Sequence, residues 1–151
     1  MESKAAIFAS LLMLGGVACA ASFPAPSVWI INPAASISSD NGPLPADKII
    51  RITAFSTRRI AITERFTDQV GAVQEIGWSG ASGISQPVKG VTGASGFFKN
   101  DGSYRFVLQD GTVEKGSFTL SEKKHVLIDT YTVTPKGRAP IHVKDVYKRA
   151  D

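Results

Sequence analysis

The sequence predicts an all-β fold, an antiparallel up-and-down meander of about eight to ten short strands. Two observations lead to this prediction. Apolar and polar residues alternate with a period of two along most segments after residue 47, which is typical of half-buried strands. Turn sequences such as Asn100 to Gly102 and Asp110-Gly111 separate these segments. Beyond residue 20, no twelve-residue window carries the apolar stripe of a helix.

The first 20 residues, MESKAAIFASLLMLGGVACA, have the order of a secretory signal peptide. Lys4 precedes an apolar stretch that is too short to span a bilayer, and Ala18-Cys19-Ala20 follows it as a cleavage site. We expect cleavage after Ala20 and a periplasmic or secreted protein. The alternative is a lipoprotein cleaved before Cys19 and anchored through that residue. No other long apolar run follows, so we expect no membrane span.

The composition fits an exported domain that is stabilised by its apolar core. Cys19 is the only cysteine of the 151 residues, so the mature chain would contain no disulfide. The formal net charge of +4 falls well short of a nucleic-acid-binding footprint, and we expect no nucleic-acid partner.

Residues 21–47 form a leader rich in Pro, Ser and Ala, with one short strand from Val28 to Asn32. Residues 48–151 continue as the β-meander and complete a single domain. Its first three strands are predicted at residues 48–55, 59–66 and 73–78. Ala54 lies on the apolar face of the first of these. If the loop at 68–72 closes symmetrically, Ile62 meets Ile76 and Ile60 meets Trp78 across the next pair.

The stretch from residue 80 to residue 96 is rich in Gly and Ser, which lowers its propensity for regular structure. We predict one short strand there, at residues 87–90, between loops. Further strands are predicted at residues 96–99, 103–109 and 112–120.

Residues 125–149 form the last predicted hairpin, with its turn near Gly137. This register opposes Asp129 to Asp145 on the same face as Tyr131 and Tyr147. Opposed carboxylates in an interior should share a proton or have a cationic partner. Three interpretations stay open: a hydrogen-bonded structural pair, a one-residue bulge in the turn that exposes one Asp, or a pair that lines a cavity and recognises a cation or hydroxyl of a ligand.

A meander of this length has free edges, and closure into a barrel removes them. We therefore expect a closed barrel whose interior is filled by side chains or holds one small ligand. A two-layer β-sandwich is the alternative.

Several short segments resemble a group of small exported bacterial proteins of unestablished function with a lipocalin-like (calycin-type) barrel. They are Trp29 with Asn32, Pro87-Val88-x-Gly90, the DG…GSFTLS segment and the closing DVYKR. The resemblance implies a barrel that can bind a small apolar ligand. It also implies that Arg149 of the last strand packs on Trp29 of the first, although Ser27 stands where lipocalins carry the Gly of Gly-x-Trp.

Signatures of catalysis are weak. GWSGA at residues 77–81 ends in Ala where a nucleophile elbow requires Gly. His125 and His142, the only histidines, are predicted on opposite faces of the last hairpin, so they cannot form a zinc site together. We expect no enzyme, no bound metal and no cofactor.

Two functions from different classes remain. The first is binding of a small apolar or amphipathic ligand, for which the candidate residues are Asp129, Asp145, Tyr131, Tyr147, Tyr104 and Phe106. The small residues Ala54, Ala61, Gly77 and Gly116 would leave room for it. The alternative is a non-catalytic interaction or envelope-maintenance module that acts through its surface or an edge strand.

Overall fold

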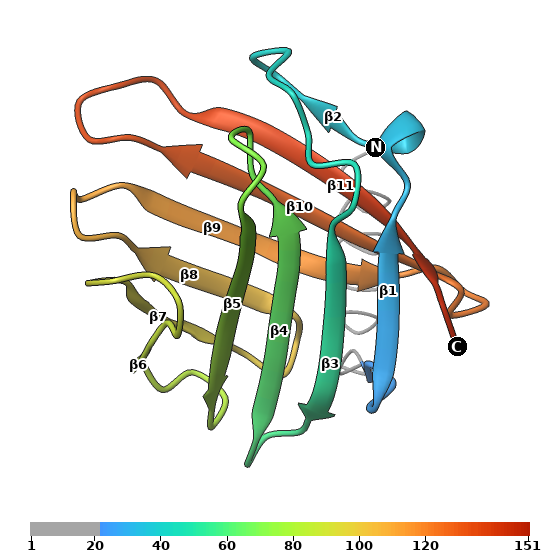
Figure 1. Cartoon of the computed structure of the whole chain (residues 1–151). Helices are drawn as coiled ribbons and strands as arrows, with labels where there is room; N and C mark the ends of the chain where they lie inside the picture. The colour runs from blue at the N-terminus through green and yellow to red at the C-terminus, as the bar shows by residue number, and fades with distance from the viewer. Residues whose placement is uncertain (1–21) are drawn as a thin grey trace, which may run out of the picture.

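The computed structural model describes residues 22–151, and these form one antiparallel β-sheet that nearly closes into a barrel (Figure 1). The predicted signal peptide and Cys19 lie outside the described residues. The strands are β1 (Ser27–Ile31), β2 (Ile37–Ser38), β3 (Ile49–Phe55), β4 (Ile60–Thr67), β5 (Val73–Gly80), β6 (Gln86–Pro87), β7 (Ser95–Phe98), β8 (Ser103–Val107), β9 (Val113–Leu120), β10 (Val126–Thr134) and β11 (Ile141–Arg149). One 3₁₀ turn, η1 (Pro33–Ala35), separates β1 from β2.

The strand order is β5-β4-β3-β1-β11-β10-β9-β8-β7-β6, and β2 pairs with β11 off this path. The all-β barrel prediction is therefore confirmed, and the order is largely that of a meander. The exception is β1, which inserts between β3 and β11 and so joins the first and last long strands of the wall. Among residues 22–151, no helix is long and apolar enough to cross a membrane.

The barrel is joined least completely between β5 and β6, which are the two ends of the strand path. We call this junction the seam. Gly77 and Lys89 exchange two backbone hydrogen bonds across it, of 3.0 and 2.8 Å. Beside them, the Trp78 indole donates to the carbonyl of Gly96 over 2.9 Å. The seam is thus closed by a few polar contacts rather than by a long ladder.

Two details of strands β3 to β5 correct the predictions made from the sequence. The loop after β4 pairs Thr67 with Val73, so Ile62 faces Trp78 and not Ile76. The predicted partners were wrong by two residues, because symmetric closure of a loop at 68–72, which is the loop observed, places Ile62 opposite Trp78. The Asp68 carboxylate orders this five-residue loop by accepting from the amides of Val70 and Ala72.

In β3 the register shifts between Ile52 and Ala54. Beyond this bulge the pleat is out of phase with the alternation in the sequence, so Phe55 packs on the core where Ala54 was expected. The ring of Phe55 lies 4.5 Å from that of Phe23. The prediction that Ala54 leaves room in the interior is therefore wrong.

The terminal hairpin has the predicted register. Asp129 pairs with Asp145, and Tyr131 pairs with Val143. Gly137 adopts a φ of 72° in the turn, a conformation that glycine reaches without strain. The turn therefore has no bulge that moves either aspartate outward, and both are buried, Asp129 at 4% exposure and Asp145 at 0%.

The core of the barrel consists mainly of large apolar side chains. Its buried members are Phe23, Trp29, Ile31, Ile50, Ile52, Ile60, Ile62, Trp78, Phe98, Tyr104, Phe118, Leu127 and Tyr147. Aromatic contacts within this core join β7, β8 and β9 to Trp78 of β5.

Candidate functional site

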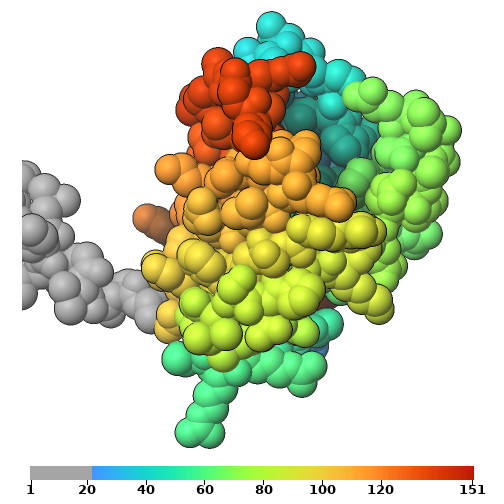
Figure 2. All heavy atoms as spheres, turned by 90° about the vertical axis from the view of Figure 1, so that its left-hand side faces the viewer, coloured from blue at the N-terminus to red at the C-terminus, as the bar shows by residue number. Residues whose placement is uncertain are grey.

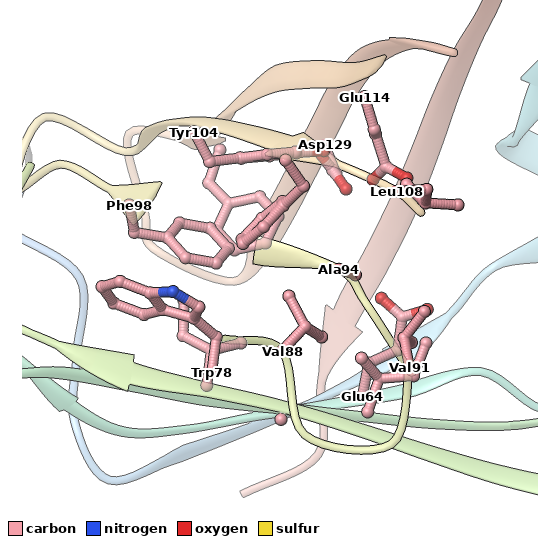
Figure 3. A pocket seen from close by; sticks show the side chains of 15 residues that line it. Glu64, Trp78, Val88, Val91, Ala94, Phe98, Tyr104, Leu108, Glu114 and Asp129 are labelled. Atoms are coloured by element: carbon pink, nitrogen blue, oxygen red, sulfur yellow. The ribbon is translucent and has the colours of Figure 1, made fainter. Parts of the chain in front are cut away.

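A cavity of about 190 Å³ lies inside the barrel, between β4 and β5 on one side and β8 to β10 on the other (Figure 3). The loop between β6 and β7 borders it with Val88, Val91 and Ala94. The other lining residues are Ile62, Glu64, Ile76, Gly77, Trp78, Phe98, Tyr104, Phe106, Leu108, Glu114, Phe118 and Asp129. In the space-filling view, the surface is hollowed between the green β4–β5 end and the orange and yellow β8–β9 strands (Figure 2).

One side of the cavity is aromatic. The ring of Phe98 lies 5.4 Å from that of Trp78, 4.9 Å from that of Tyr104 and 5.3 Å from that of Phe106. These tilted and edge arrangements are the ones that aromatic pairs prefer. They hold rigid apolar surfaces toward the cavity (Figure 3).

The other side of the cavity carries the carboxyl groups of Glu64, Glu114 and Asp129 (Figure 3). Burial raises the pKa of Glu114 to about 7, and the nearby Glu64 adds to this shift. Burial also raises the pKa of Asp129 well above its usual range, although the hydrogen bond from Tyr104 opposes the effect. The Tyr104 hydroxyl donates to Asp129 Oδ1 over 2.8 Å.

Asp145 has a different environment from its cross-strand neighbour. Its Oδ2 accepts from Lys48 Nζ at 3.0 Å and from the hydroxyls of Tyr131 and Tyr147 at 3.3 and 3.4 Å. Its Oδ1 is buried without a hydrogen-bond partner among the described residues. Lys48 Nζ also lies 3.2 Å from Glu64 Oε1. We call Lys48, Glu64, Tyr131, Asp145 and Tyr147 the lysine cluster.

Lys48 is charged in spite of its burial. Desolvation alone would lower its pKa, but Glu64 and the other groups of the lysine cluster outweigh this effect and raise the pKa well above its usual range. The exposed fraction of the Lys48 side chain is 9%. The Lys48 ammonium group therefore lies between two carboxyl groups and is not available to form an ion pair with a third.

The six predicted ligand residues separate into two groups. Tyr104, Phe106 and Asp129 line the cavity. Asp145, Tyr131 and Tyr147 belong to the lysine cluster instead. Glu64 joins the two groups, because it lines the cavity and contacts Lys48.

Three charged residues of the interior, Lys48, Glu64 and Glu114, were not predicted from the sequence. The signal was available in the strand alternation. Lys48 has the parity of the inward Ile50, Glu64 that of Ile62, and Glu114 that of Phe118. Counting inward polar residues on every strand, and not in the last hairpin alone, would have identified them.

Of the small residues expected to leave room, Gly77 lines the cavity. Gly116 does not, and the expectation is wrong there. A Cβ at this position would lie 2.5 Å from the Cβ of Tyr131 and 2.8 Å from the hydroxyl of Tyr104. Gly116 allows these two side chains to pack over the strand, so its space is already occupied.

Trp29 and Arg149 are directly paired across β1 and β11, and the guanidinium lies 5.9 Å from the indole centroid. The Trp29 indole donates to Ser27 Oγ over 2.8 Å, and Ser27 Oγ donates to the carbonyl of Pro24 over 2.6 Å. Ser27 therefore satisfies the buried indole N–H, which a Gly at this position could not do.

Within residues 22–151, no three His, Cys, Asp or Glu side chains are arranged to hold a metal ion. No protein-family model matches this chain, and no curated protein matches it.

Proposed function

We propose that the protein binds a small apolar or amphipathic ligand in the interior of its barrel, as a carrier or sensor rather than as a catalyst. The observation that carries this proposal is the 190 Å³ cavity with one aromatic and one carboxyl side. Concave sites that combine apolar surface with a few polar groups are typical of small-ligand binding.

The size of the cavity limits the ligand. An apolar cavity of about 150 Å³ accepts benzene, and pockets for drug-sized molecules usually measure about 300–1,000 Å³. A cavity of 190 Å³ therefore suits one aromatic ring with a short substituent. Long acyl chains and polycyclic ligands do not fit without rearrangement of the lining.

The structure offers a route for such a ligand at the seam. Val88, Val91 and Ala94 border the cavity and belong to the loop that follows β6. Within residues 22–151, the Gly77–Lys89 bridge is the one regular backbone pairing between this loop and β5. A local opening of the loop costs few hydrogen bonds, so it can admit a ligand while the rest of the wall stays paired. The paired Trp29 and Arg149 are consistent with a lipocalin-like barrel, which adds support from architecture.

The two tryptophans of the chain make the proposal directly testable. The Trp78 indole lines the cavity, whereas the Trp29 indole is buried against Ser27. In a titration of ¹⁵N-labelled protein with toluene, indole and 2-phenylethanol, we expect the Trp78 indole resonance to shift with saturation. The Trp29 resonance should stay in place as the internal control.

A variant that fills the cavity identifies the site. Ala94 is 6% exposed and borders the cavity, so Ala94→Leu should abolish the shift of the Trp78 resonance. Val73→Leu, on the exposed start of β5, is the control and should bind like the parent protein. If none of the three probes moves the Trp78 resonance, the ligand-binding proposal is wrong and the interaction-module alternative gains.

A further inference from the structure

Among the described residues, the lining of the cavity carries carboxyl groups and no basic side chain. The carboxyl groups are those of Glu64, Glu114 and Asp129. The nearest buried cation, Lys48, is already held by Glu64 and Asp145 at 3.2 and 3.0 Å. The charge of Lys48 opposes the rise in the pKa of Glu114 and of Asp129, but burial outweighs it in both.

Asp129 presents an unused acceptor to this space. Its side chain is 4% exposed, and Tyr104 donates to Oδ1 alone. No hydrogen bond from the described residues reaches Oδ2. Because Asp129 lines the cavity, a ligand there can reach this oxygen and donate to it when the carboxyl group is ionised.

The aromatic and acidic sides of the cavity are separate. Trp78 and Phe98 lie at one end of the close-up, and the carboxyl groups of Glu64 and Glu114 lie at the other (Figure 3). A ligand with an apolar ring at one end and a compact cation at the other matches both. An ammonium group provides three donors, and aromatic faces attract cations as well as apolar groups. The carboxyl groups do not converge as ligands of one metal ion.

We propose that the cavity selects a small organic cation, namely a primary amine in its protonated form attached to a single ring or short apolar group. This inference rests on the proposed function and names its ligand class. Glu114 supplies the charge for the ammonium. The bound cation also favours the ionised form of Asp129, whose Oδ2 then accepts one of its hydrogen bonds. Anionic ligands of the same size are excluded by the same carboxyl groups.

The amine affinity should depend on pH through Glu114. The charged and titratable groups that surround it are Lys48, Glu64, Tyr104, Asp129, Tyr131 and Asp145. With a Glu114 pKa of about 7, the carboxylate fraction rises from about a tenth at pH 6 to about nine tenths at pH 8. Binding of the amine should therefore strengthen about tenfold over this interval, whereas a neutral ligand should show no such change.

The test compares three probes of nearly equal size: 2-phenylethylamine, 2-phenylethanol and phenylacetate. At pH 8 we expect calorimetric titration to give at least about tenfold tighter binding for the amine than for the alcohol, and no binding of the carboxylate. Glu114→Gln should remove most of this preference and its pH dependence. Asp129→Asn should weaken binding of the amine to a smaller extent.

Glu75→Gln is the matched control, since it removes an exposed carboxylate from the same barrel wall. It should leave all three affinities unchanged. Equal binding of amine and alcohol would overturn the cation preference and leave the proposed function intact. If none of the three probes shifts the Trp78 resonance, the inference and the proposed function fail together.

Discussion

At the scale of residues, the pairing of Asp129 with Asp145 shows how one cross-strand pair can place two carboxyl groups in different surroundings. The two residues are directly opposed in the hairpin. Asp145 contacts the Lys48 ammonium, whereas Asp129 accepts from the neutral Tyr104 hydroxyl. Burial then favours the protonated form of Asp129, and direct repulsion between two carboxylates is avoided.

The two Asp→Asn variants should therefore behave differently at pH 7. Asp145→Asn leaves Lys48 with one partner in a buried site, and we expect the free energy of unfolding to fall by about 3 kcal/mol. Asp129→Asn replaces a neutral carboxyl by a neutral amide that can still accept from Tyr104, so a change below about 1 kcal/mol is expected. Denaturant unfolding measures both. Equal losses in the two variants would show that Asp129 is ionised in the folded protein.

Glu114 should make stability depend on pH near neutrality. Its pKa is about 7 when folded and about 4.5 when unfolded, so the folded state binds the proton more tightly. The resulting stabilisation is complete below the unfolded pKa and is lost as the pH rises through about 7. At pH 8 we expect Glu114→Gln to unfold at a higher temperature than the parent protein. The gain in the free energy of unfolding should be up to about 2 kcal/mol. At pH 4 the two proteins should melt alike, and a difference that does not change with pH would refute this assignment.

At the scale of elements, the seam depends on the close contact of Gly90 with β5. Gly90 has a φ of 88°, and a Cβ there would lie 2.2 Å from the carbonyl oxygen of Glu75. Gly83 has a similar φ of 75°, but a Cβ there would meet nothing within 4 Å. Comparing substitutions at the two glycines therefore separates the cost of the backbone conformation from the cost of a steric clash at the seam.

Gly90→Ala should open the seam, and Gly83→Ala should not. We expect a loss of about 1 kcal/mol for Gly83→Ala, which reflects the backbone alone, and about 2 to 3 kcal/mol for Gly90→Ala. Amide exchange at Gly77 and Lys89 should accelerate in the Gly90 variant alone, since these residues form the bridge. Similar exchange rates in both variants would place the entry route elsewhere.

The elements that the sequence predicted correctly are those with local determinants. The terminal hairpin follows from its alternation and from one glycine turn, so its register could be derived residue by residue. The β3 bulge has no such signal, because an extra residue between Ile52 and Ala54 leaves the local composition unchanged. The β4–β5 loop, in contrast, has a local determinant: its position at residues 68–72 was predicted correctly, and only the partners counted from it were wrong.

At the scale of the whole molecule, closure and cavity result from contacts that no local pattern specifies. A barrel could be expected because a long meander has to satisfy its edges. The insertion of β1 between β3 and β11 and the weak β5–β6 junction depend on the geometry of the complete wall. The cavity residues could be predicted in part. The strand alternation identified Tyr104, Phe106 and Asp129 as inward-facing, but it did not show which side chains leave space between them.

The position of β1 also has a consequence for how the chain folds. Strands β3 to β5 and β6 to β11 can each form from hairpins between sequence neighbours. In contrast, β1 needs β11, which is the most distant strand along the described chain. Contacts of such high sequence separation form late and slow the search for the native state. Trp29 should therefore become buried in the last step of folding, after the Trp78 side of the barrel has already formed.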